Sequence, residues 1–538
     1  MKSVKSPQVT GSGADWMMIR KGVRVSAGTN KKLVLAAMIC AVAMTFIDQT
    51  IVSIAIPDLQ KDLQLGESGA QWIVNGYLVA LAALFLFGGR IADIRGHKQM
   101  VMVGIFIFTF ASAMCGATPT GSISEAWIVF FRVVQGVGAA IMFPAALAIV
   151  VDAFPVEERG KAMAAFFGIA GGLTAVGPLA GGFLIEISWR TIFWINVPVA
   201  IVAVILTLKA NPSNEPRPAK LDYKGAVLAA IGLGLLVLGL QQASDWGWDS
   251  PATIGSIVAG IAVIAFFVRT ELRTDPPLMQ VRIFRNSAFA ADNLVLLLIS
   301  MAFVPMFLYA SMYCQISLGF SASEAGGYLG IFFGGFVIAS QWGGRMLDAI
   351  GAKRPVMIGC AVAAVGYYLW AKSMADTDPG SWNQWWRIVI AGAGSGMVLG
   401  PITTDALNRA SQTSYGEVTG ITQTARNVGA SLGIAILGTI LISENRSNIE
   451  SAFEKLGASK EQADAVASSI TQSGGGQASD AISSGGAKAQ DFLAAVQHSF
   501  AQSTEVVFYG MAVAMLLGLI VTALRVPAGK PPEAPITD

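Results

Sequence analysis

The stretch that decides the fold is GRIADIRGHK, residues 89–98, a charged loop between two apolar runs. It occurs again as GRMLDAIGAK, residues 344–353, and both copies fit the pattern G-R-x-x-D-x-x-G-x-K. The copies lie 255 residues apart, and the same displacement carries Arg132 onto Arg387. It also brings the first five apolar runs of the chain onto five runs in its second half. The sequence therefore predicts two halves of related structure.

The composition places both halves in a membrane. Of the 538 residues, 54% are hydrophobic and only 13% are charged, and the mean hydropathy is +0.59. An ordinary soluble domain carries about 25% charged residues. Runs long enough to cross a bilayer, about 17 residues or more, are predicted at 33–57, 70–89, 100–117, 126–151, 162–186, 191–208, 224–241, 252–268, 288–314, 326–343, 355–372, 385–404, 418–442 and 503–524. The sequence thus predicts fourteen membrane-spanning helices.

The distribution of positive charge orients these spans. Most of the 36 Lys and Arg residues fall on one side if the N-terminus is cytoplasmic, which predicts that both termini are inside. The predicted organisation is a cytoplasmic segment 1–32, a six-helix half 33–208, linkers with two inserted helices 209–285, a second six-helix half 286–525 and a cytoplasmic tail 526–538. Within the second half, residues 443–502 are expected to form a long outer loop, whose first part has some helical periodicity and whose Ser- and Gly-rich part, TQSGGGQASDAISSGG, is expected to be flexible. That loop is either a tolerated insertion or a docking or gating element.

Several classes of function are disfavoured. A net charge of +2 argues against nucleic-acid binding, and two histidines with four isolated cysteines argue against a metal site or a disulfide framework. The chain contains no G-x-x-x-x-G-K-[ST] phosphate loop and no recognisable nucleophile–base set. We therefore expect a protein that is not an enzyme and needs no metal or organic cofactor.

Parallel repeats of six spans build transporters whose site lies near the middle of the membrane, between the halves. Asp48, in TFIDQTIVSIAIP (residues 45–57), is a carboxylate inside the first span, and its repeat mate is Phe303. A charged group there costs about 3 kcal/mol, and such residues often mark proton pathways. Asp48 is therefore predicted to carry a proton; the alternative is a purely structural acid in an ion pair.

Five motifs in order resemble the major facilitator superfamily, specifically its fourteen-helix drug:proton antiporters. They are GRIADIRGHK, FRVVQGVGAA (residues 131–140), VGPLAGG (176–182), IDQTIVSIAIP (47–57) and WRTIFWINVP (189–198). The resemblance covers residues 33–525. Ile94 and His97 depart from the usual signature loop, where basic residues are common, and the segment after Phe320 lacks a usual proline.

The resemblance implies an all-α integral membrane fold with two six-helix halves plus two inserted helices. It places Arg132 beside Asp48 as the proton-coupling pair, although a structural role for Arg132 stays open. Residues of the signature loops are expected to control gating, as are small residues of the fifth span; the alternatives are topology-setting charge and simple packing. These residues are Gly89, Arg90, Asp93, Gly96, Lys98, Gly344, Asp348, Gly177, Pro178 and Gly181.

Polar or amphipathic residues on spans facing the centre are predicted to line a substrate cavity. They are Gln49, Asn75, Tyr77, Tyr309, Tyr313 and Gln315. Aromatic faces would suit flat lipophilic cations, although packing or interfacial positions are the common alternative. Arg387 is expected to be structural. Asp292 and Glu417, near the inner ends of their spans, are expected to meet water.

Together these features predict a proton-coupled antiporter that exports lipophilic, cationic drugs or dyes across the cytoplasmic membrane. Its partners would be the small-molecule substrate, protons and membrane lipids, with a monomeric chain and no nucleic acid. An exporter of an endogenous metabolite or lipid on the same fold is the nearest alternative. A non-transporting receptor or scaffold that uses residues 443–502 is less favoured.

Overall fold

The computed structural model describes residues 30–530 except 66, 174–175, 213–215, 217–218, 376–381, 410–414 and 457–488, and every regular element in that part is helical. The first half contains α1 (Lys31–Leu63), α2 (Glu67–Arg95), α3 (His97–Gly116), α4 (Ser124–Ala153), α5 (Val156–Gly172), α6 (Val176–Ile187), α7 (Thr191–Trp194) and α8 (Asn196–Ala210). The middle contains α9 (Tyr223–Gln241), α10 (Ala243–Trp246), α11 (Pro251–Glu271) and the short 3₁₀ helix η2 (Val281–Arg285). The second half contains α12 (Ser287–Ile316), α13 (Ala322–Ile350), α14 (Lys353–Ala371), η3 (Trp382–Gln384), α15 (Trp385–Arg409), α16 (Tyr415–Leu456) and α19 (Ala489–Arg525).

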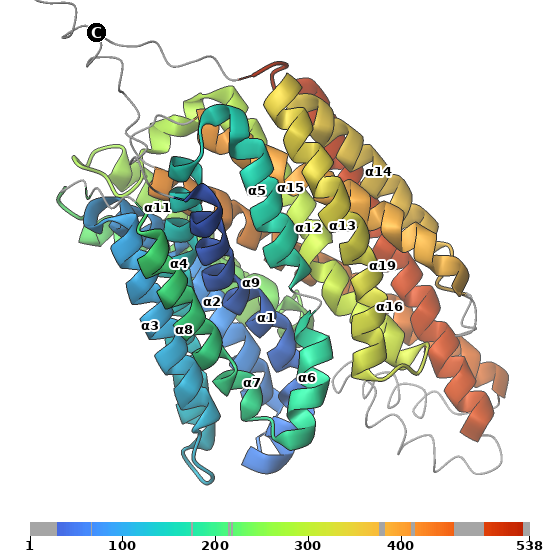
Figure 1. The fold of residues 1–538 in the computed structure, drawn as a ribbon. Coiled ribbons are helices and arrows are strands. Elements are labelled where there is room, and N and C mark those ends of the chain that lie inside the picture. The colour runs from blue at the N-terminus through green and yellow to red at the C-terminus, as the bar shows by residue number, and fades with distance from the viewer. Residues whose placement is uncertain are drawn as a thin grey trace, which may run out of the picture.

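The repeat seen in the sequence is also present in the helices. Moving α2 by 255 residues gives the bounds of α13, and moving α3 gives those of α14 to within one residue. The packing repeats as well, because α2 and α3 both pack on α4 while α13 and α14 both pack on α15. Figure 1 shows the first half, in blue to green, beside the second half, in yellow-green to red. Contacts between α2 and α16 and between α5 and α13 join the two halves.

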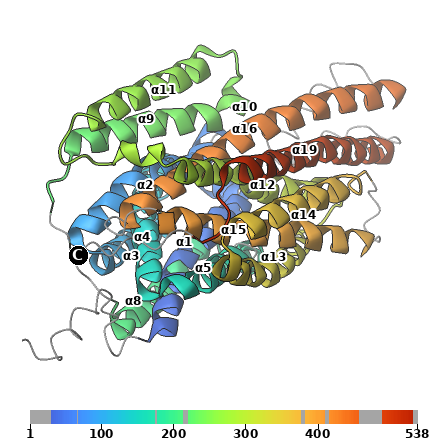
Figure 2. The same cartoon turned by 90° about the horizontal axis from the view of Figure 1, so that it is seen from above.

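The inserted helices lie at the edge of this arrangement. Helices α9 and α11 pack against each other, and α9 also contacts α2 and α16; Figure 2 shows the pair along one side of the bundle. Helix α11 exposes apolar side chains such as Ile254, Val258 and Phe266. In water these side chains would be costly to expose, whereas lipid tails are as apolar as they are.

Twelve helical segments among the described residues are long and apolar enough to cross a membrane. Two predicted spans are not among them. The predicted span 162–186 is divided between α5 and α6, and the predicted span 326–343 lies in α13, which is long but rich in glycine. The prediction of fourteen spans, and of two cytoplasmic termini, therefore stays a prediction.

The predicted outer loop, residues 443–502, is partly helical. Helix α16 continues to Leu456 and α19 begins at Ala489, so both ends of the predicted loop belong to long helices. The two extensions contact each other: Asn448 Nδ2 donates to Ser503 Oγ at 3.0 Å, and the rings of Phe453 and Phe492 are 4.8 Å apart. The helices extend into the predicted loop because hydropathy marks only the end of the apolar stretch, while helix-favouring Ala, Glu and Lys continue each helix beyond it. The bounds of the outer segment stay a prediction. Residues 457–488 lie outside the described residues.

Candidate functional site

Asp48 and Arg132 form an ion pair in the interior of the first half. Helices α1 and α4 pack together and bring the two side chains into contact; Asp48 is 0% exposed and Arg132 1%. Arg132 Nη1 donates to Asp48 Oδ2 at 2.6 Å, and Gln135 Nε2 donates to Asp48 Oδ1 at 2.8 Å. Both carboxylate oxygens therefore accept a hydrogen bond from α4, and one of these bonds is between opposite charges.

The guanidinium of Arg132 has further partners on α2 and on its own helix, α4. Its Nε donates to the carbonyl oxygen of Ile73 at 2.8 Å, and its Nη1 also donates to Gln135 Oε1 at 2.8 Å. The ring of Tyr77 lies 4.5 Å from the guanidinium carbon, a cation–π distance. Sequence reasoning did not assign a role to Gln135, although its spacing of three from Arg132 puts both on one helix face.

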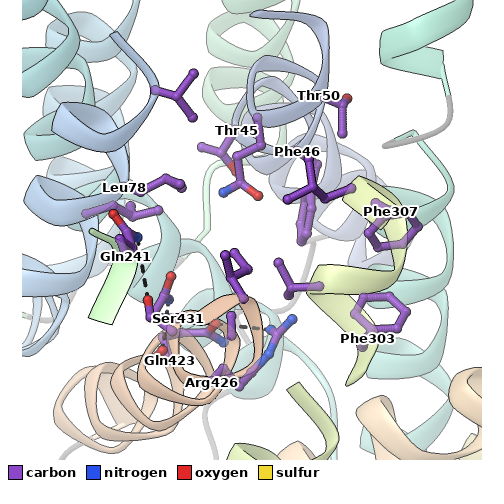
Figure 3. Close-up of a pocket in the computed structure, with 18 of the residues that line it drawn as sticks. Thr45, Phe46, Thr50, Leu78, Gln241, Phe303, Phe307, Gln423, Arg426 and Ser431 are labelled. Carbon is purple, nitrogen blue, oxygen red and sulfur yellow. Dashed lines mark hydrogen bonds between the residues drawn. The ribbon is translucent and has the colours of Figure 1, made fainter. Parts of the chain in front are cut away.

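A cavity of about 310 Å³ lies between the two halves. Residues from α1, α2, α4, α9, α12, α13 and α16 line it, so both halves and one inserted helix contribute. Six phenylalanines form much of the wall: Phe46, Phe85, Phe143, Phe303, Phe307 and Phe333. Its polar side chains are Thr45, Gln49, Thr50, Asn75, Gln241, Ser311, Gln423, Asn427 and Ser431, and its one charged side chain is that of Arg426. Figure 3 shows Gln423, Arg426 and Ser431 on one wall and Phe303 and Phe307 on another.

Of the residues predicted to line a substrate cavity, Gln49 and Asn75 do so. Tyr77, Tyr309, Tyr313 and Gln315 do not line this cavity, and a role for them in substrate binding stays a prediction. Tyr77 packs on Arg132, while Tyr309 Oη donates to the carbonyl oxygen of Ile434 at 2.9 Å and Tyr313 Oη to that of Met374 at 3.2 Å. Gln315 is exposed and bonds to Ser311 of its own helix at 3.0 Å. Each helix is rotated about its axis so that these side chains are not part of the cavity lining.

Arg426, in α16, is a cavity residue that sequence reasoning did not select. It is 8% exposed, its Nη1 donates to Gln423 Oε1 at 3.1 Å, and its guanidinium carbon lies 5.2 Å from the ring centre of Phe167. Among the described residues, the cavity lining contains no aspartate or glutamate. The available signal was that an arginine occurs inside an apolar span, where it is costly.

At the side that carries the signature loops, Asp93 joins the first half to the second. Its Oδ1 accepts from the backbone N–H of Gly416 at 2.9 Å and its Oδ2 from that of Glu417 at 2.8 Å. These N–H groups belong to the first turn of α16, where the helix dipole favours negative charge. His97 Nε2 lies 3.0 Å from Asp93 Oδ1, and Arg90 pairs with Glu417 at 3.7 Å. The signature loop therefore binds the opposite half.

The second signature loop makes the equivalent contact from the second half to the first. Asp348 accepts from the backbone N–H groups of Gly160 at 2.8 Å and Lys161 at 3.1 Å, both in α5. The helices also touch through backbone alone. A Cβ at Gly344 would lie 2.4 Å from the carbonyl oxygen of Gly160, and one at Gly89 would lie 2.1 Å from that of Gly416. We call these two contacts, Asp93 and Gly89 with α16 and Asp348 and Gly344 with α5, the joined face.

A family model for the Major Facilitator Superfamily matches residues 38–434. The chain belongs to the major facilitator superfamily. It is therefore a multi-pass membrane transporter rather than an enzyme. The tetracenomycin C resistance and export protein of Streptomyces glaucescens is 33% identical over 76% of each chain. The multidrug transporter protein MdtP of Bacillus subtilis is 30% identical over 77% of this chain and 76% of that protein.

Solved structures of the superfamily share the fold at low identity. The proton:xylose symporter XylE superposes with a TM-score of 0.60 at 11% identity, covering 93% of this chain and 96% of its own. A bacterial homologue of the lysosomal transporter Spinster, in an inward-facing unoccupied conformation, gives a TM-score of 0.58 at 16% identity, covering 94% of this chain and 99% of its own. At such identities the likeness shows the fold alone.

The remaining residues that were predicted to control gating occupy turns and close helix contacts. Gly96 separates α2 from α3 with φ of +97°, a value that favours glycine, and Lys98 Nζ donates to Asn211 Oδ1 at 2.6 Å. A Cβ at Gly177 of α6 would lie 2.0 Å from Thr50 Oγ1, so α6 approaches α1 closely, near Asp48. Gly181 is buried in α6. The side chain of Pro178 lies outside the described residues.

Two acids expected to meet water are buried instead. Asp292 is 0% exposed and lies 3.8 Å from Arg409, which also pairs with Asp405 at 2.7 Å. Glu417 is 2% exposed and accepts from the backbone N–H of Gln280 at 2.6 Å. The expectation was wrong because protein cations and N–H groups stand near these carboxylates where water was expected.

Arg387, expected to be structural, lies over the ring of Trp386 at 5.0 Å and outside the cavity lining.

Proposed function

We propose that this transporter is a proton-coupled antiporter that exports lipophilic, drug-like compounds by alternating access. The observation that carries the proposal is the buried pair of Asp48 and Arg132, which adjoins the central cavity. Gln49, the next residue along α1, lines that cavity, as does Thr45. Known relatives support the export of drugs, since the names of the Streptomyces and Bacillus proteins describe resistance, export or multidrug transport.

The repeat argues that the acid serves transport rather than the fold. The equivalent of Asp48 in the second half is Phe303, whose ring lies in the cavity wall. The same architecture is therefore built with an apolar residue at this place. A buried ion pair is weak support for stability, because the cost of desolvating both charges offsets much of their attraction. The carboxylate therefore adds a group that can bind and release a proton.

Protonation of Asp48 would remove the negative charge that Arg132 binds at 2.6 Å. The hydrogen bond from Gln135 Nε2 would then point to a neutral carboxyl group. Packing between α1 and α4 would lose its strongest polar contact, and this change would be coupled to separation of the joined face. In this scheme a proton taken up from outside accompanies release of the substrate, and its loss to the inside accompanies loading.

The energy of one proton is sufficient for useful export. A pH difference of one unit supplies about 1.4 kcal/mol per proton, and a potential of 100 mV supplies about 2.3 kcal/mol per charge. Exchange of one proton for one neutral molecule would sustain a concentration ratio of roughly 500-fold under both forces. A cationic substrate, as predicted from the sequence, would meet no carboxylate in the described part of the cavity lining. The proposal therefore requires a lipophilic substrate but no positive charge.

The test is Asp48→Asn in purified protein reconstituted into lipid vesicles with an imposed pH gradient. Efflux of a xanthene dye driven by the gradient should be lost, while exchange of dye at equal pH on both sides should persist, because the amide cannot carry a proton. Asp62→Asn is the matched control. Asp62 is on the same helix, and its side chain is 49% exposed and 3.6 Å from Arg190. Gradient-driven efflux by the Asp48 variant at the wild-type rate would contradict the proposal.

A further inference from the structure

We infer that the central cavity selects compounds that combine an aromatic body with an anionic group, and that Arg426 binds the anion. The inference rests on the proposed export function, because it takes the cavity between the halves as the place where the exported compound binds. It names a substrate class of the opposite charge to the one expected from the sequence.

The first observation is that Arg426 is a buried cation that pairs with no acid among the residues that the structure describes. Its only hydrogen bond within the described residues is to the neutral amide oxygen of Gln423, and its Nε is buried with no acceptor. Gln423 Nε2, in the same wall, is also a buried donor without an acceptor in that part of the chain. A guanidinium carries five N–H donors, and a buried cation without a counter-ion is strongly disfavoured. An anion in the cavity would accept from both side chains.

Arg132 is a buried arginine whose charge is neutralised within the protein, and it serves as a comparison for Arg426. That guanidinium is 1% exposed and is bound by the carboxylate of Asp48 and two further oxygen acceptors. Arg426 is buried to a similar degree, at 8% exposed, yet it has one neutral acceptor. The difference indicates that the charge of Arg426 is left for a partner outside the chain.

The repeat shows that the fold does not need Arg426. Its equivalent in the first half is Gly171, and the equivalent of Gln423 is Gly168, both in α5. There the small residues pack against α13, since a Cβ at Gly171 would lie 3.4 Å from the ring of Phe336. The arginine is therefore a single-copy feature of the second half, as Asp48 is of the first.

The other walls define the body of the compound. Phe303 and Phe307 of α12 and Phe333 of α13 face the same cavity as Arg426, together with rings from the first half. Stacked or edge-on contacts with these rings favour flat aromatic groups. A cationic compound of the same shape would bring its charge near Arg426 with no carboxylate in the described lining, so it should bind less well.

The test compares two dyes with the same ring system, fluorescein as the anion and rhodamine 123 as the cation. Fluorescence anisotropy on the purified full chain would give a Kd for each without any proton gradient. We expect the wild type to bind fluorescein more tightly. Arg426→Gln should weaken fluorescein binding roughly 10- to 100-fold, as expected for loss of hydrogen bonds to a charged group, and should leave rhodamine 123 binding unchanged or tighter. Arg387→Gln, an arginine in a span but outside the cavity lining, is the matched control and should change neither Kd.

A second variant, Gln423→Glu, keeps the arginine and adds a carboxylate where the amide oxygen now lies 3.1 Å from Nη1. It should weaken fluorescein binding and strengthen rhodamine 123 binding, and it carries the test if Arg426→Gln does not fold. Tighter binding of rhodamine 123 by the wild type, or an unchanged fluorescein Kd in the folded variants, would overturn the inference. Failure of proton coupling would leave these Kd values intact, so the two proposals can fail separately.

Discussion

Gly89→Ala should push the joined face apart. The added Cβ would lie 2.1 Å from the carbonyl oxygen of Gly416 and 2.8 Å from its carbonyl carbon. Both atoms belong to the backbone of α16, so no side-chain rotation relieves the clash. Cβ contacts with other atoms are normally 3.4 Å or longer, and α2 must therefore move away from α16 by about 1 Å, judged from van der Waals contact distances. Gly344→Ala makes the matching change against Gly160, at 2.4 Å.

The magnitude follows from where the strain acts. Overpacking a tight contact costs typically about 1–3 kcal/mol, and here the cost falls only on the conformation in which the halves are joined. The helix-propensity gain of alanine over glycine, up to about 1 kcal/mol, is present in both conformations and cancels. The ratio of joined to separated molecules should therefore fall by roughly 5- to 150-fold.

The assay uses spin labels at two exposed positions, Arg95→Cys within the first signature loop and Arg354→Cys just after the second, once the four native cysteines are replaced. Electron-spin distance distributions in lipid would report the joined and separated populations. Gly330→Ala is the matched control on α13, because a Cβ there would meet nothing within 4 Å. It should leave the distribution as in the wild type.

The result that would refute this reasoning is a wild-type distance distribution in both Gly89→Ala and Gly344→Ala. A shift in only one of the two variants would show that the two contacts of the joined face are not equivalent, contrary to the repeat. Dye efflux should also slow in both variants, since each cycle must pass through the joined conformation.

Two further predictions concern the ion pair and the charge of the substrate. Gln135→Leu removes the donor to Asp48 Oδ1, so the protein should lose about 1–3 kcal/mol of stability, seen as a lower midpoint of thermal unfolding in detergent; an unchanged midpoint would mean that this hydrogen bond contributes nothing. Exchange of one proton for a monovalent anion moves two charges, so a potential of 100 mV, inside negative, should add about 4.6 kcal/mol to export of the fluorescein monoanion. A potassium diffusion potential in vesicles would show this dependence, whereas export that ignores the potential would point to a cationic substrate.

The helical architecture followed closely from the sequence. The repeat in residues 89–98 and 344–353 predicted two related halves, and α2 and α13 have bounds that differ by that same displacement. The pairing of Asp48 with Arg132 was also expected, because the first and fourth helices pack together in the family fold that the motifs resemble. The choice of spans depends on local pattern, since hydropathy sets which segments are helical and apolar.

The cavity was predicted poorly because its lining depends on how each helix is rotated and on how the two halves meet. Tyr309 and Tyr313 are on the expected helix, yet neither lines the cavity, and their hydroxyl groups bond to the carbonyl oxygens of Ile434 and Met374. Arg426 could be placed in an apolar span from the sequence. Its missing counter-charge could not, because this depends on every helix that surrounds it.

Sequence pattern was thus sufficient for the membrane fold, the repeat and the choice of Asp48 as the acid with no counterpart in the second half. The contact of Asp93 with α16, between residues 323 positions apart, and the unneutralised charge of Arg426 emerged only from the packed helices. The physical reason is that hydropathy and helix propensity act over a few turns. Contacts between halves depend instead on close packing of surfaces that the chain brings together from distant segments.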